Sequence, residues 1–347
     1  MAARSRRIKF GVRIPPCTSI TAVAAAVRHA EDWKFDVAWI ADSQLLWRDV
    51  YAAMAVAATR TERIHLATAV TNFETRHPSV VASAINTIAE IAPGRCILGI
   101  GSGDSSVKPL SMRPSTLEHM RASIAMTRTL LSGEEFAFGA RISRMRDATG
   151  SVPIHLAASG PRTFELAGEV ADGIVTLAGI SAEPLIEIRE AVKRGCVAGE
   201  RELSDLELTV GAFCRITDNI ERDAAILKPI CFHIASIGGQ SSLSLAGIEL
   251  DAPPYVPDVY PDMVHAEDWD LAVERSAKYV TDEMAVKFAQ AFCLFGSVEE
   301  IISRIDKAVE IGATAFYLRH VGNYTLPTEL IETFGNEILP HYGSASL

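Results

Sequence analysis

The sequence predicts an α/β protein of the (β/α)8 TIM-barrel class with insertions, folded as a single domain over residues 1–347. Eight short apolar segments alternate with longer amphipathic segments of helical periodicity, and such alternation is typical of parallel α/β folds. Several of the apolar segments are hydrophobic on both faces, as strands are when helices cover a parallel sheet. The length of the chain also fits one such barrel. A doubly wound sheet with an appended domain is the alternative topology.

The predicted strands, in chain order, are residues 8–14, 35–41, 63–70, 95–101, 153–158, 172–178, 206–216 and 314–320. Helices are expected at about 19–33 and 48–60, and a third from Pro78, because a proline lacks only an N–H that the first helical turn does not use. Ser115 to Glu118 and Ser297 to Glu300 both match the capping-box pattern of a helix start.

Two segments interrupt the alternation. Residues 134–152 form a polar link between the fourth predicted helix and the fifth strand. Residues 237–290 are longer and rich in glycine, serine and proline at their start. A long insertion in a barrel is usually functional or a separate helical subdomain, and we expect this one to cover the end of the barrel where the strands finish.

Composition excludes several classes of protein. Hydrophobic residues make up 48% and charged residues 22%, which is an ordinary globular balance, and the net charge of −10 does not suit a nucleic-acid partner. No apolar run approaches the ~20 residues that a membrane helix needs, and the N-terminal residues lack the apolar core of a signal peptide. The six cysteines form no CxxC pair, as expected of reduced thiols. We therefore expect a cytoplasmic protein.

In a barrel, catalytic groups come from the carboxyl ends of the strands and the loops that follow. This rule selects Arg13 after the first strand, Asp42 and Ser43 with Trp47 after the second, and His320 after the eighth, which ends at Arg319-His320. The remaining strand ends contribute Ala69, Val70, Asn72, Gly101, Ser102, Gly103, Asp104, Ala157, Ala158, Ser159, Gly160, Thr176 and Gly179. No HxxxH or HExxH pair occurs, so we expect no metal site.

The fifth strand end carries the clearest local signal. Small residues at 157–160 allow a close backbone approach, and the helix expected after Pro161 would direct its free N–H groups at an anion such as a phosphate. The alternative is a turn of small residues that only packs helix on strand. GIGSG at 99–103 is not a dinucleotide fingerprint, because Asp104 stands where the last glycine is needed. In a barrel it would offer a flat surface for a ring, or only a tight turn.

Together these segments resemble the bacterial luciferase-like superfamily, and within it the branch that uses the deazaflavin coenzyme F420, which includes methylenetetrahydromethanopterin reductase-like enzymes. The resemblance is carried by RIHLATAVTNFETRHPSVVASAINTIAEIAPGRCILGIGSGD and by PIHLAASGPRTFELAGEVADGIV. KFGVRIPP, FDVAWIADS and FGSVEEIISRIDKAVEIGATAFYL fit as well.

The resemblance implies a deazaflavin lying across the barrel end, propped by a non-prolyl cis peptide between Ala69 and Val70. Asp42, Val70, Asn72 and the Gly101–Asp104 backbone would surround its ring. The residues Ala157, Ala158, Ser159 and Gly160 would hold the phosphate, and Thr176 and Gly179 would line the exit of the tail.

Three positions bear on the reaction. Sugar-phosphate dehydrogenases of this branch carry a histidine where this chain has Ser43, which argues against that activity. The acid that they carry after the glycines is retained as Asp104. The methanopterin reductases carry a glutamate where we align Arg13, and an arginine there could stabilise negative charge on the reduced ring or on a substrate carboxylate.

We therefore predict an oxidoreductase that transfers a hydride between F420 and a small organic substrate with a C=N, C=C or C=O bond. Asp104 would transfer the proton, Asp42 would hold the ring, and Arg13 with Ser43, Trp47 and His320 would face the substrate. A luciferase-like monooxygenase that uses FMN is the first alternative, and a non-catalytic protein that binds flavin or deazaflavin is the second. We also expect a homo-oligomer.

Overall fold

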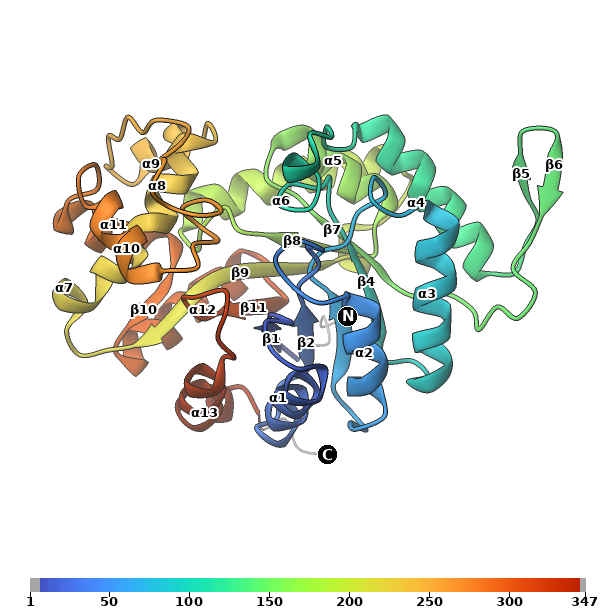
Figure 1. Cartoon of the computed structure of the whole chain (residues 1–347), viewed down its shortest axis with the longest axis horizontal. Helices are drawn as coiled ribbons and strands as arrows, with labels where there is room; N and C mark the ends of the chain where they lie inside the picture. Colours follow the sequence, from blue (N-terminus) through green and yellow to red (C-terminus); the bar gives the residue numbers. More distant parts are fainter. Residues whose placement is uncertain (1–6, 344–347) are drawn as a thin grey trace.

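Eight parallel strands form the centre of the molecule and close into a barrel (Figure 1), which confirms the predicted (β/α)8 fold. The computed structural model describes residues 7–343. Neighbouring strands follow the order β9-β11-β1-β2-β3-β4-β7-β8, and pairing of β8 with β9 closes the ring. The strands are β1 (Lys9–Ile14), β2 (Val37–Ile40), β3 (His65–Thr68), β4 (Cys96–Ile100), β7 (Ile154–Ala157), β8 (Gly173–Thr176), β9 (Glu207–Ile216) and β11 (Ala315–Arg319).

Helices on the outside of the barrel cover the strands. They are α1 (Ile20–Asp32), α2 (Val50–Ala58), α3 (Pro78–Ile91), α4 (Leu117–Leu131), α5 (Pro161–Val170), α6 (Ala182–Ala198), α12 (Val298–Ile311) and α13 (Thr328–Glu337). The capping box predicted at Ser297 to Glu300 is present at the start of α12. The one predicted at Ser115 is wrong. Thr116 caps α4 instead, because the Ser115 hydroxyl donates to Glu74, 2.6 Å away.

The side chains inside the barrel follow a single rule. A buried cluster separate from the main core fills the barrel interior, and every member has an odd residue number: Val37, Trp39, Ala67, Ile97, Val175 and Tyr317, with Ala69 against it. Successive residues of a strand point to opposite faces, so even-numbered neighbours such as Leu318 join the outer core beneath the helices. The indole of Trp39 is accommodated because Gly11 lacks a Cβ, which would overlap its Nε1 atom.

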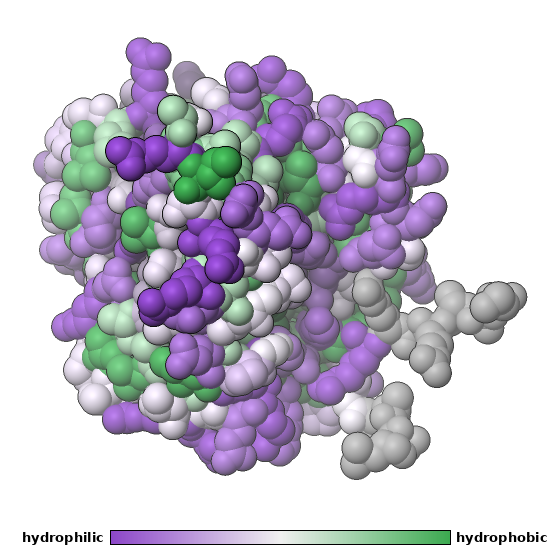
Figure 2. Space-filling view, turned by 90° about the vertical axis from the view of Figure 1, so that its right-hand side faces the viewer, coloured by the Kyte–Doolittle hydropathy of each residue, from purple (hydrophilic) through white to green (hydrophobic). Residues whose placement is uncertain are grey.

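A short hairpin replaces the polar link expected at 134–152. Strands β5 (Phe136–Phe138) and β6 (Arg141–Ser143) pair antiparallel and project from the side of the barrel (Figure 1). Figure 2 shows the face of the molecule on this side, which is mostly hydrophilic with small separate hydrophobic areas.

A helical segment lies between β9 and β10 (Leu294–Gly296), beside the barrel (Figure 1). It contains α7 (Ile220–Asp223), a 3₁₀ turn at Ala224–Leu227, α8 (Lys228–Ser236), α9 (Gln240–Leu245), α10 (Trp269–Ser276) and α11 (Asp282–Phe292). Further 3₁₀ turns lie outside the segment, at Lys108–Leu110, Leu203–Asp205 and Leu339–His341. The segment packs around its own hydrophobic core. It is longer than the expected 237–290, because α7 and α8 occupy the place in the sequence where an ordinary barrel helix follows its strand. Among the described residues, no helix is both long and apolar enough to cross a membrane.

Candidate active site

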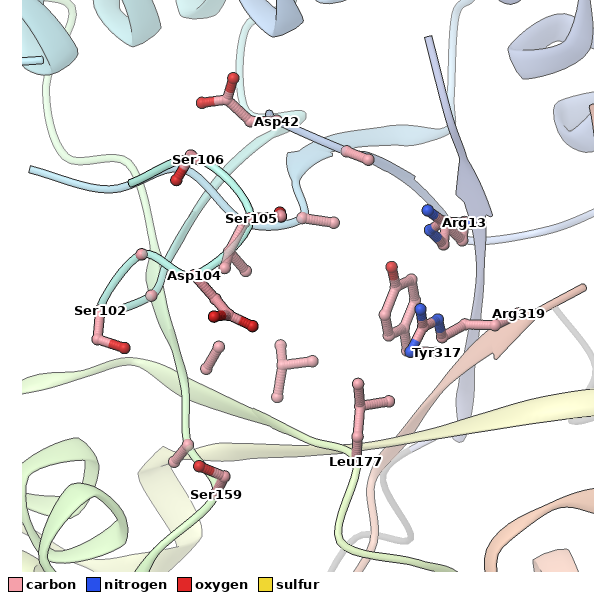
Figure 3. A pocket seen from close by; sticks show the side chains of 18 of the residues that line it. Arg13, Asp42, Ser102, Asp104, Ser105, Ser106, Ser159, Leu177, Tyr317 and Arg319 are labelled. Atoms are coloured by element: carbon pink, nitrogen blue, oxygen red, sulfur yellow. The ribbon is translucent and has the colours of Figure 1, made fainter. Parts of the chain in front are cut away.

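A cavity of about 350 Å³ opens at the carboxyl ends of the barrel strands, here called the mouth. This volume lies in the range of small-molecule sites, roughly 300–1,000 Å³. Twelve residues predicted from the sequence line it: Arg13, Asp42, Trp47, Ala69, Val70, Gly101, Ser102, Gly103, Asp104, Ala157, Ala158 and Ser159. Residues far apart in the chain therefore meet here, as Figure 3 shows for the labelled side chains.

One wall of the cavity is formed by the end of β3 against the end of β4. The peptide bond between Ala69 and Val70 is cis, as the resemblance implied. A Cβ on Gly101 would lie 2.6 Å from Cγ2 of Val70, so only glycine allows this approach. The wall is consequently smooth and carries few side-chain atoms.

Ser43 and Asn72 do not line the cavity but support the turn that does. The Ser43 hydroxyl shares a 2.7 Å hydrogen bond with that of Ser105, and Asn72 Nδ2 donates to Ser106 Oγ at 3.0 Å. Both Ser105 and Ser106 line the cavity, although we did not predict them. The role expected for Ser43 on the substrate side is therefore indirect in this structure.

Asp42 is buried at the edge of the cavity, and its carboxylate turns away from the centre (Figure 3). Oδ2 accepts a hydrogen bond of 2.6 Å from Arg76. Burial raises the pKa of Asp42, while the nearby Arg76 charge acts in the opposite direction. Oδ1, like the hydroxyls of Thr71 and Tyr51, is buried without a hydrogen-bond partner among residues 7–343. A polar group that remains unpaired inside the fold commonly awaits a ligand or water.

Asp104 lies at the rim of the cavity and is open to solvent. Its side chain is 52% exposed and forms an ion pair with Lys108, one helical turn along the chain. Proton donation by a carboxylic acid is favoured by apolar surroundings, because they disfavour the charged form. The structure shows instead an exposed, ion-paired group.

The far side of the cavity carries Arg13, Tyr317 and Arg319 (Figure 3), and Trp47 lies against Arg13. Arg13 is buried and donates to the side chain of Asn323 at 2.6 Å, and its guanidinium lies 5.1 Å from the centre of the Trp47 ring. The Trp47 indole donates to the Asn323 carbonyl at 2.9 Å. Trp47 is thus held in place as a wall of the site.

His320 does not line this cavity, and our placement of it at the mouth is wrong. It lies in a separate cavity beside β9, where its Nε2 contacts the Thr325 carbonyl oxygen at 2.9 Å. Arg319 faces the mouth in its place. Because adjacent residues of a strand point in opposite directions, alignment with Tyr317 would have selected Arg319 from the sequence.

The loop before α5 also reaches the cavity. Ala157, Ala158 and Ser159 line it, and Gly160 caps α5 without any side-chain hydrogen bond. The N–H groups of Ser159 and Gly160 have no partner among residues 7–343. Gly160, Thr176 and Gly179 lie outside the lining, and the Thr176 hydroxyl accepts a hydrogen bond of 3.2 Å from the Ala178 N–H.

Further lining residues were missed by the sequence analysis: Ala41, Ser105, Ser106, Val175, Leu177, His265, Tyr317 and Arg319. His265 comes from the helical segment, whose path the sequence does not reveal. Within residues 7–343, no group of three or more histidine, cysteine or acidic side chains is arranged to hold a metal ion.

The model of the luciferase-like monooxygenase family matches residues 3–315, and the chain belongs to this family. It is 29% identical to a 5,10-methylenetetrahydromethanopterin reductase of Methanolobus tindarius over 317 residues, covering 88% of this chain and 92% of the reductase. It is 36% identical over 201 residues to an F420-dependent glucose-6-phosphate dehydrogenase of Beutenbergia cavernae, covering 52% of this chain and 60% of the dehydrogenase. Among solved structures, the coenzyme F420-dependent tetrahydromethanopterin reductase of Methanopyrus kandleri shares the fold, with a TM-score of 0.77, 22% identity and coverage of 97% and 99% of the two chains.

Proposed function

We propose that this protein is an F420-dependent oxidoreductase that transfers a hydride between the deazaflavin and a small organic substrate. The relatives described above are named as reductases or dehydrogenases, and two of those names specify F420. One observation carries the proposal for this chain. The smooth wall at Val70 and Gly101 and the residue Ser159, whose N–H group is unpaired among residues 7–343, line a single cavity, and the unpaired N–H of Gly160 follows directly at the start of α5.

These residues fit a coenzyme with a flat ring and a phosphate-bearing tail. The Val70 wall would support the ring, and Asp42 would lie at the edge of the ring. The N–H groups of Ser159 and Gly160, reinforced by the dipole of α5, would hold the phosphate. When bound, the deazaflavin supplies the hydride chemistry, and the protein positions it and excludes water.

Asp104 remains our candidate for proton transfer. It lies across the cavity from Arg13 and Arg319 (Figure 3). A substrate bound between these two sides would displace water from the carboxylate, and desolvation raises the pKa of an acid. The helical segment contributes His265 to the same cavity, so it would cover the substrate side of the mouth.

Parallel titrations of the purified protein with F420 and with FMN test the cofactor. We expect F420 to bind and FMN to bind at least ~100-fold more weakly, followed by turnover that does not require dioxygen. Preference for reduced FMN with dioxygen-dependent turnover would favour the monooxygenase alternative. Binding of either without turnover across a broad substrate panel would favour the non-catalytic one.

The phosphate position has its own test in Ser159→Glu. A carboxylate at the exposed start of α5 would repel the phosphate and block the loop, so F420 affinity should fall at least tenfold. Ser83→Glu on the exposed face of α3 is the matched control and should keep wild-type affinity. Unchanged affinity in Ser159→Glu would remove the phosphate from this loop.

A further inference from the structure

Two arginines stand side by side at the mouth. Strands β1 and β11 pair in parallel with Gly11 opposite Tyr317 and Val12 opposite Leu318. The next step of this register places Arg13 beside Arg319. Both residues line the cavity, and Figure 3 shows their guanidinium groups on the same side of it, across from Asp104.

Neither arginine forms an ion pair with a carboxylate of residues 7–343. Arg13 donates only to neutral oxygens, at Gly322 and Asn323. Arg319 lies over the Phe213 ring at 4.2 Å, and its Nε is buried without a hydrogen-bond partner in that same part of the chain.

The acids of the cavity do not compensate these charges. Asp42 is paired with Arg76, and Asp104 is paired with Lys108. Two positive charges therefore remain without a counterion in a partly buried position. This is notable in a protein whose net charge is −10, because acidic residues were available to neutralise them.

Such an arrangement is costly in the free protein. Like charges on neighbouring strand positions repel each other, and a buried charge without an opposite partner is strongly unfavourable. Burial, with the Arg319 charge adding to it, lowers the pKa of Arg13 to about 10, and burial also lowers the pKa of Arg319. Both groups still carry a full charge at neutral pH, so the cost persists until an anion binds.

We infer that Arg13 and Arg319 bind an oxyanion of the substrate, which makes the substrate an organic carboxylate or phosphate monoester whose reacting bond lies close to the anion. The face of the Arg319 guanidinium rests on Phe213, and a guanidinium can pair through its N–H groups with the two oxygens of such a group. The reacting end of the substrate then lies between the arginines and Asp104. The part of this inference that concerns the reaction rests on the proposed function, whereas the binding of an anion by the two arginines does not depend on it.

The test measures binding by calorimetry on the full-length protein without F420. The probes are benzoate, crotonate and phenyl phosphate, with benzamide and crotonamide as neutral counterparts. We expect at least one anion to bind at least tenfold more tightly than its neutral counterpart. Whether the protein prefers the carboxylates or phenyl phosphate then shows which of the two groups the substrate carries. Equal affinity for anions and amides, or no binding of any anion, would overturn the inference.

Variants then locate the anion. Arg319→Gln should weaken anion binding at least tenfold, as expected for loss of a charge-assisted hydrogen bond, and Arg319→Lys should be intermediate. Arg144→Gln removes the same charge at an exposed position after the hairpin and should bind like wild type. Because the charge is unpaired, Arg319→Gln should melt no lower than Arg144→Gln. A clear drop in melting temperature would instead assign Arg319 a structural role.

F420 titration separates this inference from the proposed function. Arg319→Gln should bind F420 within twofold of wild type. A loss of F420 affinity with unchanged anion binding would mean that the arginines serve the cofactor, and would overturn the inference alone. Anion binding that depends on Arg319 in a protein that binds no F420 would sustain the inference and remove the proposed function.

Discussion

Asp104 occupies the rim of the cavity as the only acid there with an exposed side chain among the described lining residues. Its carboxylate forms an ion pair with Lys108. In the proposed reaction this ion pair belongs to the free protein, because Asp104 must take up and release a proton in each turnover. A bound substrate that displaces water changes the surroundings of Asp104 far more than those of the buried Asp42.

Asp104→Asn removes the proton while keeping the size of the side chain. We expect turnover to fall about 100-fold or more, the scale of a positioned acid, with F420 affinity within twofold of wild type. Steady-state rates across pH check this, because the limb of the profile that reports the acid should disappear. Asp147→Asn, at an exposed ion pair, is the control. Wild-type turnover with an unchanged pH profile would assign Asp104 to shaping the loop.

The sequence predicted the positions of strand ends better than the direction of side chains at those ends. Arg13, Asp42 and Ser159 were found because Arg13 lies at the end of β1, Asp42 follows β2, and Ser159 precedes α5. We selected His320 instead of Arg319 because histidine is a common catalytic residue. Which of the two side chains faces the mouth is decided by the alternation of side chains along β11, and that alternation selects Arg319. His265 could not be predicted, because no local sequence pattern indicates that the loop carrying it folds back to the mouth.

Helices α5 and α6 pack backbone against backbone, and this contact sets where α5 begins. A Cβ on Gly195 would overlap the carbonyl oxygen of Glu165, and one on Gly168 would overlap that of Val192. The glycines therefore permit a close approach that fixes α5, and with it the loop at 157–160 that reaches the cavity.

Gly195→Ala should push the two helices apart. Overpacking of this kind costs about 1–3 kcal/mol, and movement of α5 should also weaken F420 binding severalfold. Denaturant unfolding and F420 titration on the same sample measure both effects. Lys193→Ala, an exposed position in the same helix, should change neither. If Gly195→Ala lost stability but kept full F420 affinity, α5 would not position the loop.

The alternating strands and helices of the barrel could be predicted from the sequence, whereas the short strands and the helical segment added to the barrel could not. The eight barrel strands lie in apolar segments that recur along the chain between helical segments, and all of them form. Strands β5, β6 and β10 each span three residues, too few for a periodic signal. The start of the helical segment was missed because α8 has the apolar face that a helix on the barrel would have.

Across the whole molecule, four histidines make the stability of the fold depend on pH. Burial lowers the pKa of His65, His155, His233 and His320, in the last case to about 4. In the unfolded chain a histidine titrates near 6.5. Between these values the unfolded chain binds more protons than the folded one, so the stability present above about pH 6.5 is lost as the pH falls toward 4.

We therefore expect the melting temperature to fall between pH 7.5 and pH 5. His320→Gln can still donate to the Thr325 carbonyl but cannot be protonated, so its melting temperature should fall less over this range. Asp36 and Asp42, whose pKa values burial raises, act in the opposite direction, but they are present in both proteins and cancel in the comparison. Identical pH slopes for the two proteins would contradict the assignment to His320.

The helical segment between β9 and β10 has a hydrophobic core of its own, distinct from the core of the barrel. A second cavity of about 200 Å³ lies between this segment and the loop of Asp104 and Ser105, and both cavities include His265. The walls proposed to hold the coenzyme come from β3, β4 and β7, which do not belong to the segment. We therefore expect that exchanging or randomising residues 217–293 changes the side of the mouth next to His265 and leaves the proposed coenzyme walls and the two arginines in place.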